Sequence, residues 1–589
     1  MKRYLITALL LAFTATACDF LEPLPDGSYN EDNFADYPTI IRGYVDKAYN
    51  LRPSSYYSSE YMGTDACTDD LLYRVKSHSI RQYSIGNAQM GSHPISGVWS
   101  RDYKAIYYVN LFLQDDLGRN TRYLVDDGSN EVLQRCLQGD AFALRAWFAF
   151  NLLQFWGGEG PDGSLLGVYI PTSPIDIDKD DVADMVRPSY DESVKQILAD
   201  CDSAIKYLPP ANRDQYLQGE SFHVTGAVRY RAFDGVSMKA LKARVLLTWA
   251  SPAFNRSNDA TRWMEAAKVA REVIDFKLNG EKGGLKPAES FMWTNPNAAE
   301  IISLGNIASN ATYEKAFYPL GFGGEANMAP SQELVNAFPM ANGYPIDNPA
   351  SGYNPANPYE GRDPRFYANI FYNGCEVKRN QSPFNLMYTF RTAEGEKDAP
   401  GGLQTSPSGY YIKKYISLGW NPNDSSIQTA QHCIFFSRWA HICLMFAEAA
   451  NNAVGPNTAI DGLTARDALA YIRNRKVNTG TEDKPGVGTA GDPYLAACCS
   501  SKEAFDALVK NEWRVETCFE GIRYHNVRRW ATDVAELNVP VHGVTISGGS
   551  YSYNEIERRS YPSLWMPVPY SELRIAPGLV QNKGWESWK

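Results

Sequence analysis

The stretch GDAFALRAWFAFNLLQFWG, from Gly139 to Gly157, decides the fold class of this chain. It is apolar on nearly every face of a helix, and such a helix must be covered by neighbouring elements on all sides. We therefore predict that residues 139–157 form a buried helix at the centre of a mostly helical fold.

A second apolar segment supports the same fold class. KALKARVLLTWASPAFN, from Lys239 to Asn255, has apolar residues at four-residue spacing, which places them on one face of a helix. Ser251-Pro252 is predicted to break this helix, because proline lacks an amide hydrogen and disfavours the helical conformation of the residue before it.

The C-terminal half holds further helical signals. IFFSRWAHICLMFAEAAN, from Ile434 to Asn451, is predicted to be a helix that pairs antiparallel with a second one over residues 465–475. The capping box Thr464-x-x-Asp467 opens that second helix. Another capping signal opens a helical run over residues 500–519, which Gly521 closes as a C-cap.

Long loops separate these helices. The segments 54–96, 287–327 and 379–407 are dense in Gly, Pro, Asn and Tyr. Loops of this length in a compact domain are usually functional, so we expect the ligand-binding face among them. Segments typical of strands, such as 409–415, are few and short.

Several blocks along the chain resemble those of one known family, the SusD/RagB family. NEWRVETCFEGIRYHNVRRW (511–530) is similar to its charged helix, Phe-Glu-Gly segment and basic turn, and LWMPVPYSELRIAPGLVQNKGW (564–585) to its usual ending. PSQELVNAF (330–338), RDPRFYANIFYNG (362–374) and GYYIKKY (409–415) resemble its middle part. The blocks cover most of the chain in the family's order.

The resemblance implies a mostly α fold, in which a helical-repeat scaffold of TPR-like helix pairs lies beneath a long-loop ligand-binding face with few short strands. This architecture comes from the resemblance alone, since the sequence shows no consensus of period 34. The chain departs from the family pattern at His441, where an acid is more usual, and at Trp513, which replaces a frequent Arg.

The first residues have the layout of a secretory signal. Lys2 and Arg3 precede an apolar stretch that is too short to span a bilayer. Ala15-Thr16-Ala17-Cys18 resembles a bacterial lipobox, although Ala15 stands where Leu is usual. We expect residues 1–17 to be a signal peptide and Cys18 to be lipidated, with cleavage by an ordinary signal peptidase as the alternative.

No linker divides the remainder of the chain, because Pro and Gly are spread through the loops and no low-complexity run occurs. We therefore expect residues 18–589 to form a single SusD-like domain with an N-terminal part (about 18–330) and a C-terminal part (about 331–589).

Charge and composition narrow the ligand class. A net charge of −10 argues against nucleic acid, whose phosphates require a basic surface. The aromatic share of 13% suits carbohydrate, because sugar C–H faces stack on rings, although packing in a helical core explains most of these residues. The ten cysteines form no C-x-x-C pair, so zinc is unsupported.

Three glutamates offer the sharpest alternative to a binding function. Glu512, Glu516 and Glu520 are spaced by four and lie on one helix face, and paired carboxylates can serve a glycoside hydrolase. Acids stacked on one helix rarely line a groove, and nearby arginines favour a structural charge network. The arginines predicted as partners are Arg514, Arg523, Arg528 and Arg529.

Other catalytic or metal motifs are missing from the sequence. It contains no H-E-x-x-H, no G-x-S-x-G and no Gly-rich phosphate loop. Asp176-x-Asp178-x-Asp180-Asp181 could hold calcium, but it lacks the features of an EF-hand, and a solvated acidic loop is the favoured interpretation. We therefore predict a protein without catalysis and without a cofactor, with structural calcium unsupported.

Two loops offer both rings and polar groups for a glycan, and a third flanks them. The first runs over residues 56–83 and the second over 293–322. Packing is the alternative for each aromatic residue, as it is for Trp99, which lies on a helical face. The predicted ligand-binding residues are Tyr61, Asp69, Tyr73, Arg81, Trp293, Tyr313, Tyr318, Phe322 and Tyr388.

The function implied by the resemblance is capture of oligosaccharide or polysaccharide at the cell surface. The implied partner is a TonB-dependent outer-membrane transporter of the SusC type, and the implied location is the outer membrane, with the lipid anchor holding the protein at the cell exterior. Two other classes stay open. One is a peptide-binding uptake lipoprotein like RagB, and the other is a surface glycoside hydrolase that uses Glu512 or Glu516.

Overall fold

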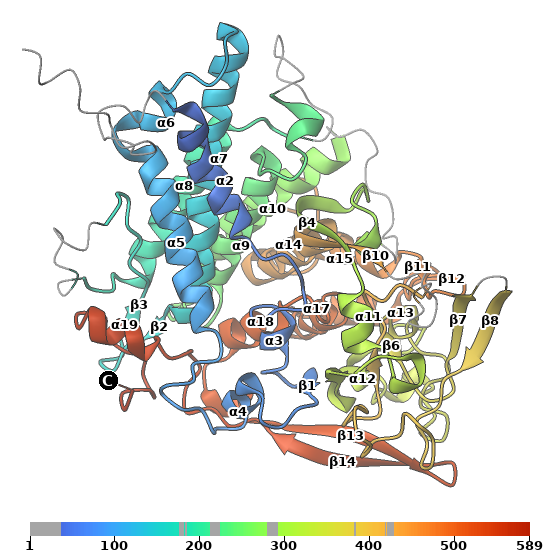
Figure 1. The fold of residues 1–589 in the computed structure, drawn as a ribbon. Helices are drawn as coiled ribbons and strands as arrows, with labels where there is room; N and C mark the ends of the chain where they lie inside the picture. The colour runs from blue at the N-terminus through green and yellow to red at the C-terminus, as the bar shows by residue number, and fades with distance from the viewer. Residues whose placement is uncertain are drawn as a thin grey trace, which may run out of the picture.

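The computed structural model describes residues 37–175, 182, 185–212, 224–279, 292–381, 384–418, 420 and 429–588, and its fold is mostly helical (Figure 1). Cys18, the signal peptide and the acidic run Asp176–Asp181 lie outside the described residues. In the described part of the chain, no helix combines the length and apolar character needed to cross a membrane.

The long helices pack as neighbours in chain order. Each one contacts the next: α2 on α5, α5 on α7, α7 on α8, α8 on α9, α9 on α10 and α10 on α14, and α14 in turn contacts α15 and α17. This serial packing of adjacent helices is the arrangement of a helical-repeat scaffold. The long helices are α2 (Pro38–Asn50), α5 (Ser96–Leu113), α7 (Asp127–Trp156), α8 (Tyr190–Tyr207), α9 (Gly235–Ala250), α10 (Ala260–Asn279), α14 (Trp439–Val454), α15 (Ala465–Arg473), α17 (Lys502–Glu516) and α18 (Arg523–Trp530).

Helix α7 contains the segment that decides the fold class, and it is buried as predicted. Nearly every side chain from Cys136 to Trp156 is buried. The helix begins twelve residues before the predicted start, because the Asp126 carboxylate accepts a hydrogen bond from the Ser129 amide (2.8 Å) and caps the helix there. Helix α9 ends at Ala250, so the predicted break at Ser251-Pro252 is confirmed.

One helix prediction was wrong at its start. Residues 430–438 form strand β10, and helix α14 begins only at Trp439. The aromatic and β-branched run before Trp439 pairs antiparallel with β4 (Ile301–Asn310), so tertiary pairing overrides the helical pattern there. The following helix α15 is capped as predicted, with the Thr464 hydroxyl accepting a hydrogen bond from the Asp467 amide.

Helix α17 is capped by Ser501 and ends at Glu516, three residues before the predicted end. Phe519 (φ 67°) and Gly521 (φ 74°) have left-handed backbone, which cannot continue a helix. Gly521 also lies against Tyr61, where an added Cβ would come within 2.5 Å of the Tyr61 Cα. Only glycine fits this contact.

The described strands form seven two-stranded pairs, all antiparallel. The predicted strand at 409–415 is reduced to β9 (Tyr411–Ile412), paired with β6 (Ile370–Phe371). The other pairs are β1 (Leu71–Tyr73) with β5 (Met328–Pro330), β2 (Gly158–Glu159) with β3 (Leu165–Leu166), β7 (Glu376–Gln381) with β8 (Phe384–Thr389), β11 (Val477–Asn478) with β12 (Asp483–Lys484), and β13 (Pro540–Ser547) with β14 (Ser550–Arg558).

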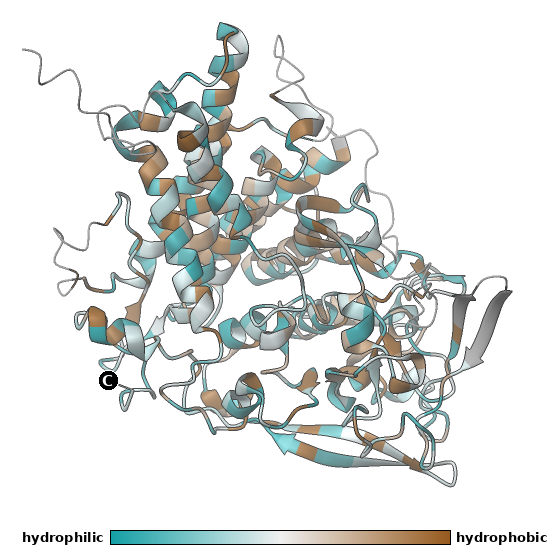
Figure 2. Cartoon of the chain, in the orientation of Figure 1, coloured by the Kyte–Doolittle hydropathy of each residue, from teal (hydrophilic) through white to brown (hydrophobic). Residues whose placement is uncertain are grey.

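Short helices complete the loop-rich side of the molecule, and apolar residues concentrate where the long helices face one another (Figure 2). One buried cluster runs from Ile41 to Trp588 and includes residues of both predicted parts of the chain. A second cluster lies among α9, α10, α14, α15 and α17. The short helices are α3 (Met62–Asp65), α4 (Ser79–Ser84), α6 (Leu117–Asn120), α11 (Thr312–Phe317), α12 (Gln332–Ala337), α13 (Pro364–Asn369), α16 (Pro493–Cys498) and α19 (Tyr570–Ile575).

Candidate functional site

The first predicted ligand loop pairs through β1 with β5, a strand that follows the second predicted ligand loop in the sequence. Leu71, Leu72 and Tyr73 lie opposite Pro330, Ala329 and Met328, and the Arg74 amide continues the ladder by donating to the Asn327 carbonyl (3.0 Å). Two segments about 250 residues apart in the sequence are therefore held side by side by backbone hydrogen bonds. This fixed framework positions the side chains that project above it.

A surface hollow of about 290 Å³ opens above this pairing, and we name it the β1–β5 hollow. Its volume is close to the lower end of the range typical of small-ligand sites. Its lining combines rings, hydroxyls and an amide. The lining residues are Tyr57, Ser58, Ser59, Tyr73, Val75, His78 and Asn327.

Stacked rings form one wall of the hollow. The imidazole of His78 lies parallel to the phenol ring of Tyr73, with centroids 3.8 Å apart and an interplanar angle of 11°. The His78 Nδ1 accepts a hydrogen bond from the Ile80 amide (3.3 Å) and caps helix α4, so the proton of the neutral ring sits on Nε2. Burial lowers the pKa of His78, which keeps the ring uncharged at neutral pH.

A fixed polar group stands opposite these rings. Arg74 Nη2 donates to the Asn327 Oδ1 (3.1 Å), and the Asn327 Nδ2 donates to a Glu325 carboxylate oxygen (3.0 Å). Tyr57 packs its ring edge against Phe317, with centroids 4.9 Å apart. The hollow thus presents an uncharged ring wall and an oriented amide, which suits a neutral ligand rich in hydroxyl groups.

The three glutamates, Glu512 and Glu516 in α17 and Glu520 in the turn that follows it, lie in a different environment, inside the protein. Glu512, Glu516 and Glu520 are all buried, and Glu512 is fully so. Each carboxylate is bound by basic side chains from other elements. Glu512 is held by Arg365 (2.8 Å) and Arg473, Glu516 by Arg475 (2.6 Å), Arg438 (2.9 Å) and Arg365 (3.3 Å), and Glu520 by Arg438 (2.7 Å), Lys414 (2.7 Å) and His441 (2.9 Å). We name this set the α17 charge network.

The predicted structural role of the glutamates is thus supported, but the predicted partners were wrong. Arg514 and Arg523 bind Asp69 (2.8 and 3.1 Å), Arg529 binds Glu448, and Arg528 lies over the Tyr524 ring. Helical geometry explains why Arg514 does not bind these glutamates, because a residue two positions from a glutamate projects from the opposite side of the helix.

The positive charges of neighbouring side chains lower the pKa values of these glutamates more than burial raises them. Burial raises the pKa of Glu516, but Arg475, Arg438 and Arg365 outweigh it and hold that pKa well below its usual range. Glu520 behaves in the same way, because Arg438 and Lys414 outweigh its burial and leave its pKa far below the usual range. Neither carboxylate can act as a general acid near neutral pH, and neither reaches a ligand.

Comparison with known proteins agrees with this geometry. The model of the SusD family matches residues 288–585. The chain belongs to the SusD family. A second family model, described as starch-binding and associating with the outer membrane, matches residues 19–221. Proteins of the SusD family are binding proteins without catalytic activity, so the interpretation that this chain is not an enzyme is confirmed.

Solved structures share the fold of this SusD-family chain. A SusD-like protein from Bacteroides fragilis is 23% identical, with a TM-score of 0.70 over 94% of this chain and 98% of that one. A SusD-like carbohydrate-binding protein from the same species is 17% identical, with a TM-score of 0.66 over 93% and 99%. A SusD homologue from Bacteroides thetaiotaomicron is 17% identical, with a TM-score of 0.61 over 95% and 99%. Among curated proteins, none matches the chain. The predicted SusD/RagB membership and mostly helical fold are thus confirmed.

The first predicted loop contributes three rings to the hollow of this SusD-family protein, Tyr57, Tyr73 and His78, and of these only Tyr73 is among the predicted ligand-binding residues. Tyr73 lines the hollow, whereas Tyr61 lines a cavity inside the protein. Asp69 is engaged by Arg514 and Arg523. Arg81 is buried behind the hollow, where it binds Glu557 (2.5 Å) and the Tyr73 carbonyl (2.5 Å). Arg81 therefore supports the wall and does not face the ligand.

The predicted aromatic residues of the second loop lie mostly in the core. Trp293 is 5% exposed, with its faces against Phe435 and its edge toward Tyr415. Tyr313 is buried, and its hydroxyl accepts hydrogen bonds from the Ser55 hydroxyl and the Tyr56 amide. Both residues therefore pack in the core, which was the alternative to ligand binding for each predicted aromatic residue.

The remaining predicted residues are not brought to the hollow. Tyr318 is fully buried and donates to the Ser417 carbonyl (3.1 Å), and Phe322 is half-buried beside it. The Tyr388 side chain lies outside the described residues, although its backbone is part of β8. Tyr57 belongs to the first predicted loop, although it is not among the predicted ligand-binding residues. Sequence reasoning did not select His78 or Asn327, and only their positions in Tyr- and Asn-rich segments could have indicated them.

The two departures from the family pattern have local partners. The His441 Nε2–H donates to the Glu520 carboxylate within the α17 charge network (2.9 Å), and Trp513 Nε1 donates to Glu448 (2.8 Å). In the described part of the chain, no cluster of three or more His, Cys, Asp or Glu side chains could hold a metal ion, and the nine described cysteines are free and buried.

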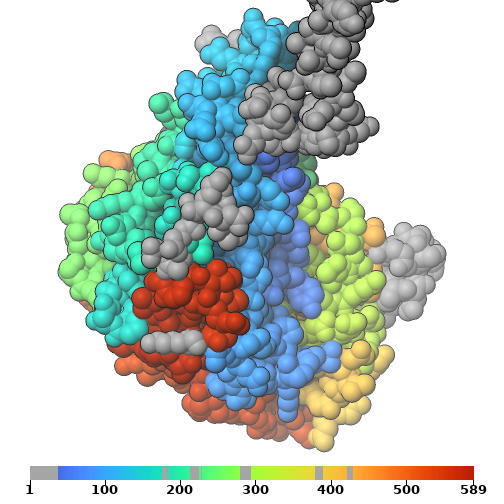
Figure 3. Space-filling model, turned by 60° about the vertical axis from the view of Figure 1, so that its left-hand side comes forward, coloured from blue at the N-terminus to red at the C-terminus, as the bar shows by residue number. Residues whose placement is uncertain are grey.

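A larger groove, of about 1110 Å³, lies between α5 and α19. In Figure 3 the C-terminal residues, in red, lie directly beside the blue surface of α5. Tyr103, Tyr107 and Tyr169 contribute rings, but Leu111, Ile575 and other aliphatic groups make up much of the wall. A substitution in this groove can therefore serve as the control for a substitution in the β1–β5 hollow.

Proposed function

We propose that this chain is a cell-surface glycan-binding protein that captures oligosaccharide or polysaccharide in the β1–β5 hollow. The observation that carries the proposal is the pairing of an uncharged ring wall, Tyr73 and His78, with the oriented amide of Asn327. Rings bind the C–H faces of sugars, and fixed amide and hydroxyl groups bind their hydroxyls. Two findings support the same ligand class. The chain belongs to the SusD family, and a second family model, described as starch-binding, matches its N-terminal part.

The proposal extends to location and partner. Residues 1–17 act as the signal peptide, the lipid on Cys18 holds a single domain of residues 18–589 at the outer membrane, and a TonB-dependent transporter of the SusC type receives the glycan. Support comes from the lipobox-like Ala15-Thr16-Ala17-Cys18 and from the outer-membrane association in the family description.

Affinity electrophoresis tests the ligand class. The protein is run through native gels that contain plant, host or microbial polysaccharides, beside a folded control protein. We expect retardation in at least one gel, without shorter products in the gel eluate. Loss of retardation on addition of a protein digest, or unchanged migration in every gel, would move the assignment away from glycan capture.

A variant pair locates the binding surface. His78→Asn removes the ring face and keeps a good helix cap for α4, so the fold is preserved. Tyr107→Ala removes the exposed ring of the groove between α5 and α19. We expect His78→Asn to abolish most of the retardation and Tyr107→Ala to leave it unchanged. The reverse result would assign the glycan to the larger groove.

A further inference from the structure

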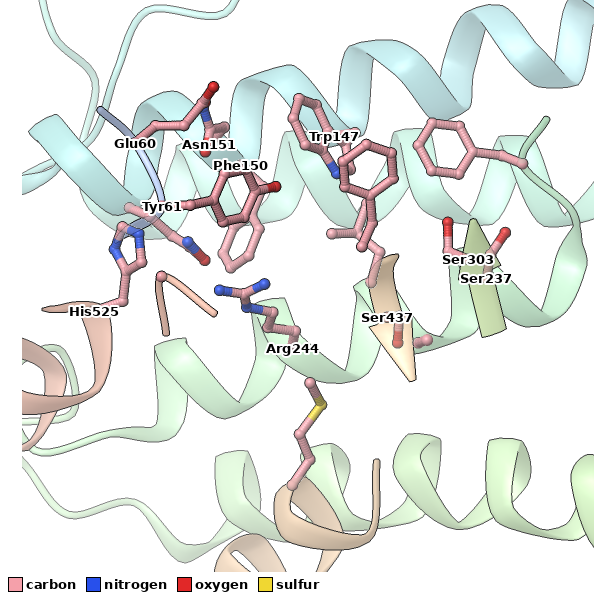
Figure 4. A pocket seen from close by; sticks show the side chains of 17 residues that line it. Glu60, Tyr61, Trp147, Phe150, Asn151, Ser237, Arg244, Ser303, Ser437 and His525 are labelled. Carbon is pink, nitrogen blue, oxygen red and sulfur yellow. The ribbon is translucent and has the colours of Figure 1, made fainter. Parts of the chain in front are cut away.

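An internal cavity of about 50 Å³ lies between helices α7 and α9, and it shares no lining residue with the β1–β5 hollow. Figure 4 shows Arg244 reaching from α9 toward α7, with its guanidinium group between Phe150 and His525. Tyr61 lies on the same side, and Ser303 and Ser437 line the other end. A smaller hollow of about 20 Å³ shares Arg244 and His525, so the guanidinium group borders both spaces.

Arg244 has no counter-charge in the described part of the chain. No described carboxylate forms an ion pair with it. The acids around it are already engaged: Glu60 by both donors of Arg101, Glu448 by Arg529 and Glu520 by the α17 charge network. Burial lowers the pKa of Arg244, the Tyr61 hydroxyl partly raises it and Arg529 lowers it further, but an arginine stays protonated at such values.

Several hydrogen-bond donors line the cavity. The Tyr61 hydroxyl and the Gln154 amide line it near Arg244, and at the other end the buried Ser437 hydroxyl has no hydrogen-bond partner in the described part of the chain. The pKa of the Tyr61 phenol is raised by burial, so the group keeps its proton and can donate. Four donor groups therefore face a space that contains no free protein acceptor of negative charge.

A buried charge without a partner costs several kcal/mol, and buried donors without acceptors add to that cost. We propose that this cavity binds a small monovalent anion, held by Arg244 with the Tyr61, Gln154 and Ser437 donors. The site is independent of glycan binding. An anion there links α7 and α9 of the N-terminal part to β10 of the C-terminal part.

The size of the cavity selects the class of anion. A water needs about 10–15 Å³ of such space, so the cavity has room for about four waters or for one ion of the size of chloride, bromide or acetate. The guanidinium fork fits a carboxylate best, and the apolar walls of Phe150 and Met445 fit a weakly hydrated ion. A bulky carboxylate such as gluconate is too large to enter.

Thermal unfolding in two matched salts tests the proposal. The protein is unfolded in equal concentrations of sodium acetate and sodium gluconate, which have the same charge and ionic strength. We expect acetate at tenfold its dissociation constant to raise Tm by about 1 °C over gluconate, because binding to the folded state stabilises it. Equal Tm values across the whole concentration series would overturn the proposal.

Variants connect the effect to the cavity. Arg244→Met removes the charge and keeps the length of the side chain, so it should abolish the difference between acetate and gluconate. Arg119, which is exposed and lies outside the cavity, provides the matched control, and Arg119→Met should keep the difference. An acetate effect that persists in Arg244→Met would contradict the assignment.

A crystal soaked in sodium bromide locates the ion directly and needs no variant. The expected result is an anomalous difference peak within hydrogen-bond distance of the Arg244 guanidinium group. Bromide peaks confined to surface lysines and arginines, with only water beside Arg244, would overturn the proposal even if Arg244→Met fails to fold.

Discussion

The α17 charge network and the β1–β5 hollow use similar side chains in opposite ways. In the network, three glutamates are buried and each is bound by two or three basic groups. In the hollow, a neutral histidine stacked on Tyr73 and an asparagine oriented by Arg74 and Glu325 line an open surface. The acids that look catalytic in the sequence hold the fold, and inconspicuous loop residues form the candidate binding surface.

This contrast shows that the neighbouring elements decide whether a polar side chain can contact a ligand, because a side chain that they already bind is not available. Arg365 and Arg438 come from segments that are distant in the sequence, and they donate hydrogen bonds to the carboxylate oxygens of the glutamates. In the described part of the chain, no ion pair involves the residues that line the β1–β5 hollow, where Arg74 and Glu325 only orient the Asn327 amide. Each prediction below tests one side of this contrast.

The largest effect is expected inside the network. Glu516→Ala leaves three arginines, Arg365, Arg438 and Arg475, without a shared carboxylate. Removing one partner of a buried ion pair typically costs about 3–5 kcal/mol, so the free energy of unfolding should fall by that amount. Denaturant unfolding measures it. Glu503→Ala, at the exposed start of the same helix, should change it by less than about 1 kcal/mol.

A somewhat smaller effect is expected at Trp293. This ring lies in the core against Phe435 and Tyr415, so Trp293→Ala should lower the free energy of unfolding by about 3 kcal/mol through loss of packing. The glycan affinity of the folded fraction should not change. A variant that keeps its stability but loses glycan binding would place Trp293 in the binding surface and would break the contrast.

A moderate effect on binding alone is expected at the hollow. His78→Asn should weaken glycan binding about tenfold, which corresponds to about 1.4 kcal/mol, because one stacking face is lost. Its Tm should stay within about 1 °C of the wild type, since the asparagine still caps α4. Isothermal titration and thermal unfolding of the same preparation measure both quantities.

The smallest effect is expected from pH. Burial lowers the pKa of His78 below its usual value, so more than half of the rings are already neutral at pH 6.5 and nearly all are neutral at pH 8. Glycan affinity should therefore change less than about twofold between pH 6.5 and 8. A steep gain in affinity as the pH falls would mean that the ligand is anionic and meets a protonated histidine.

The sequence predicted most of the scaffold and little of the site. The buried helix around residues 139–157 and the end of α9 at Ser251-Pro252 follow from local apolar pattern and proline chemistry. Strand β10 could not be foreseen, because its pairing with β4 joins segments more than 100 residues apart.

The same limit applies to the binding residues. Of the predicted aromatic loop residues, Tyr73 lines the β1–β5 hollow, whereas Trp293, Tyr313 and Tyr318 pack in the core. Whether a ring faces solvent depends on tertiary packing, which the spacing of residues within a loop does not encode. The importance of His78 follows only from its stacking on Tyr73 and its role as a cap.

The most direct test of the account measures binding and stability together in two variants, His78→Asn and Glu512→Gln, against the polysaccharide that retards the wild type. The account predicts a crossed result. His78→Asn loses about tenfold in affinity with its Tm unchanged, and Glu512→Gln loses stability while its folded fraction binds as the wild type does. A stable Glu512→Gln that fails to bind, together with a His78→Asn that binds normally, would contradict it.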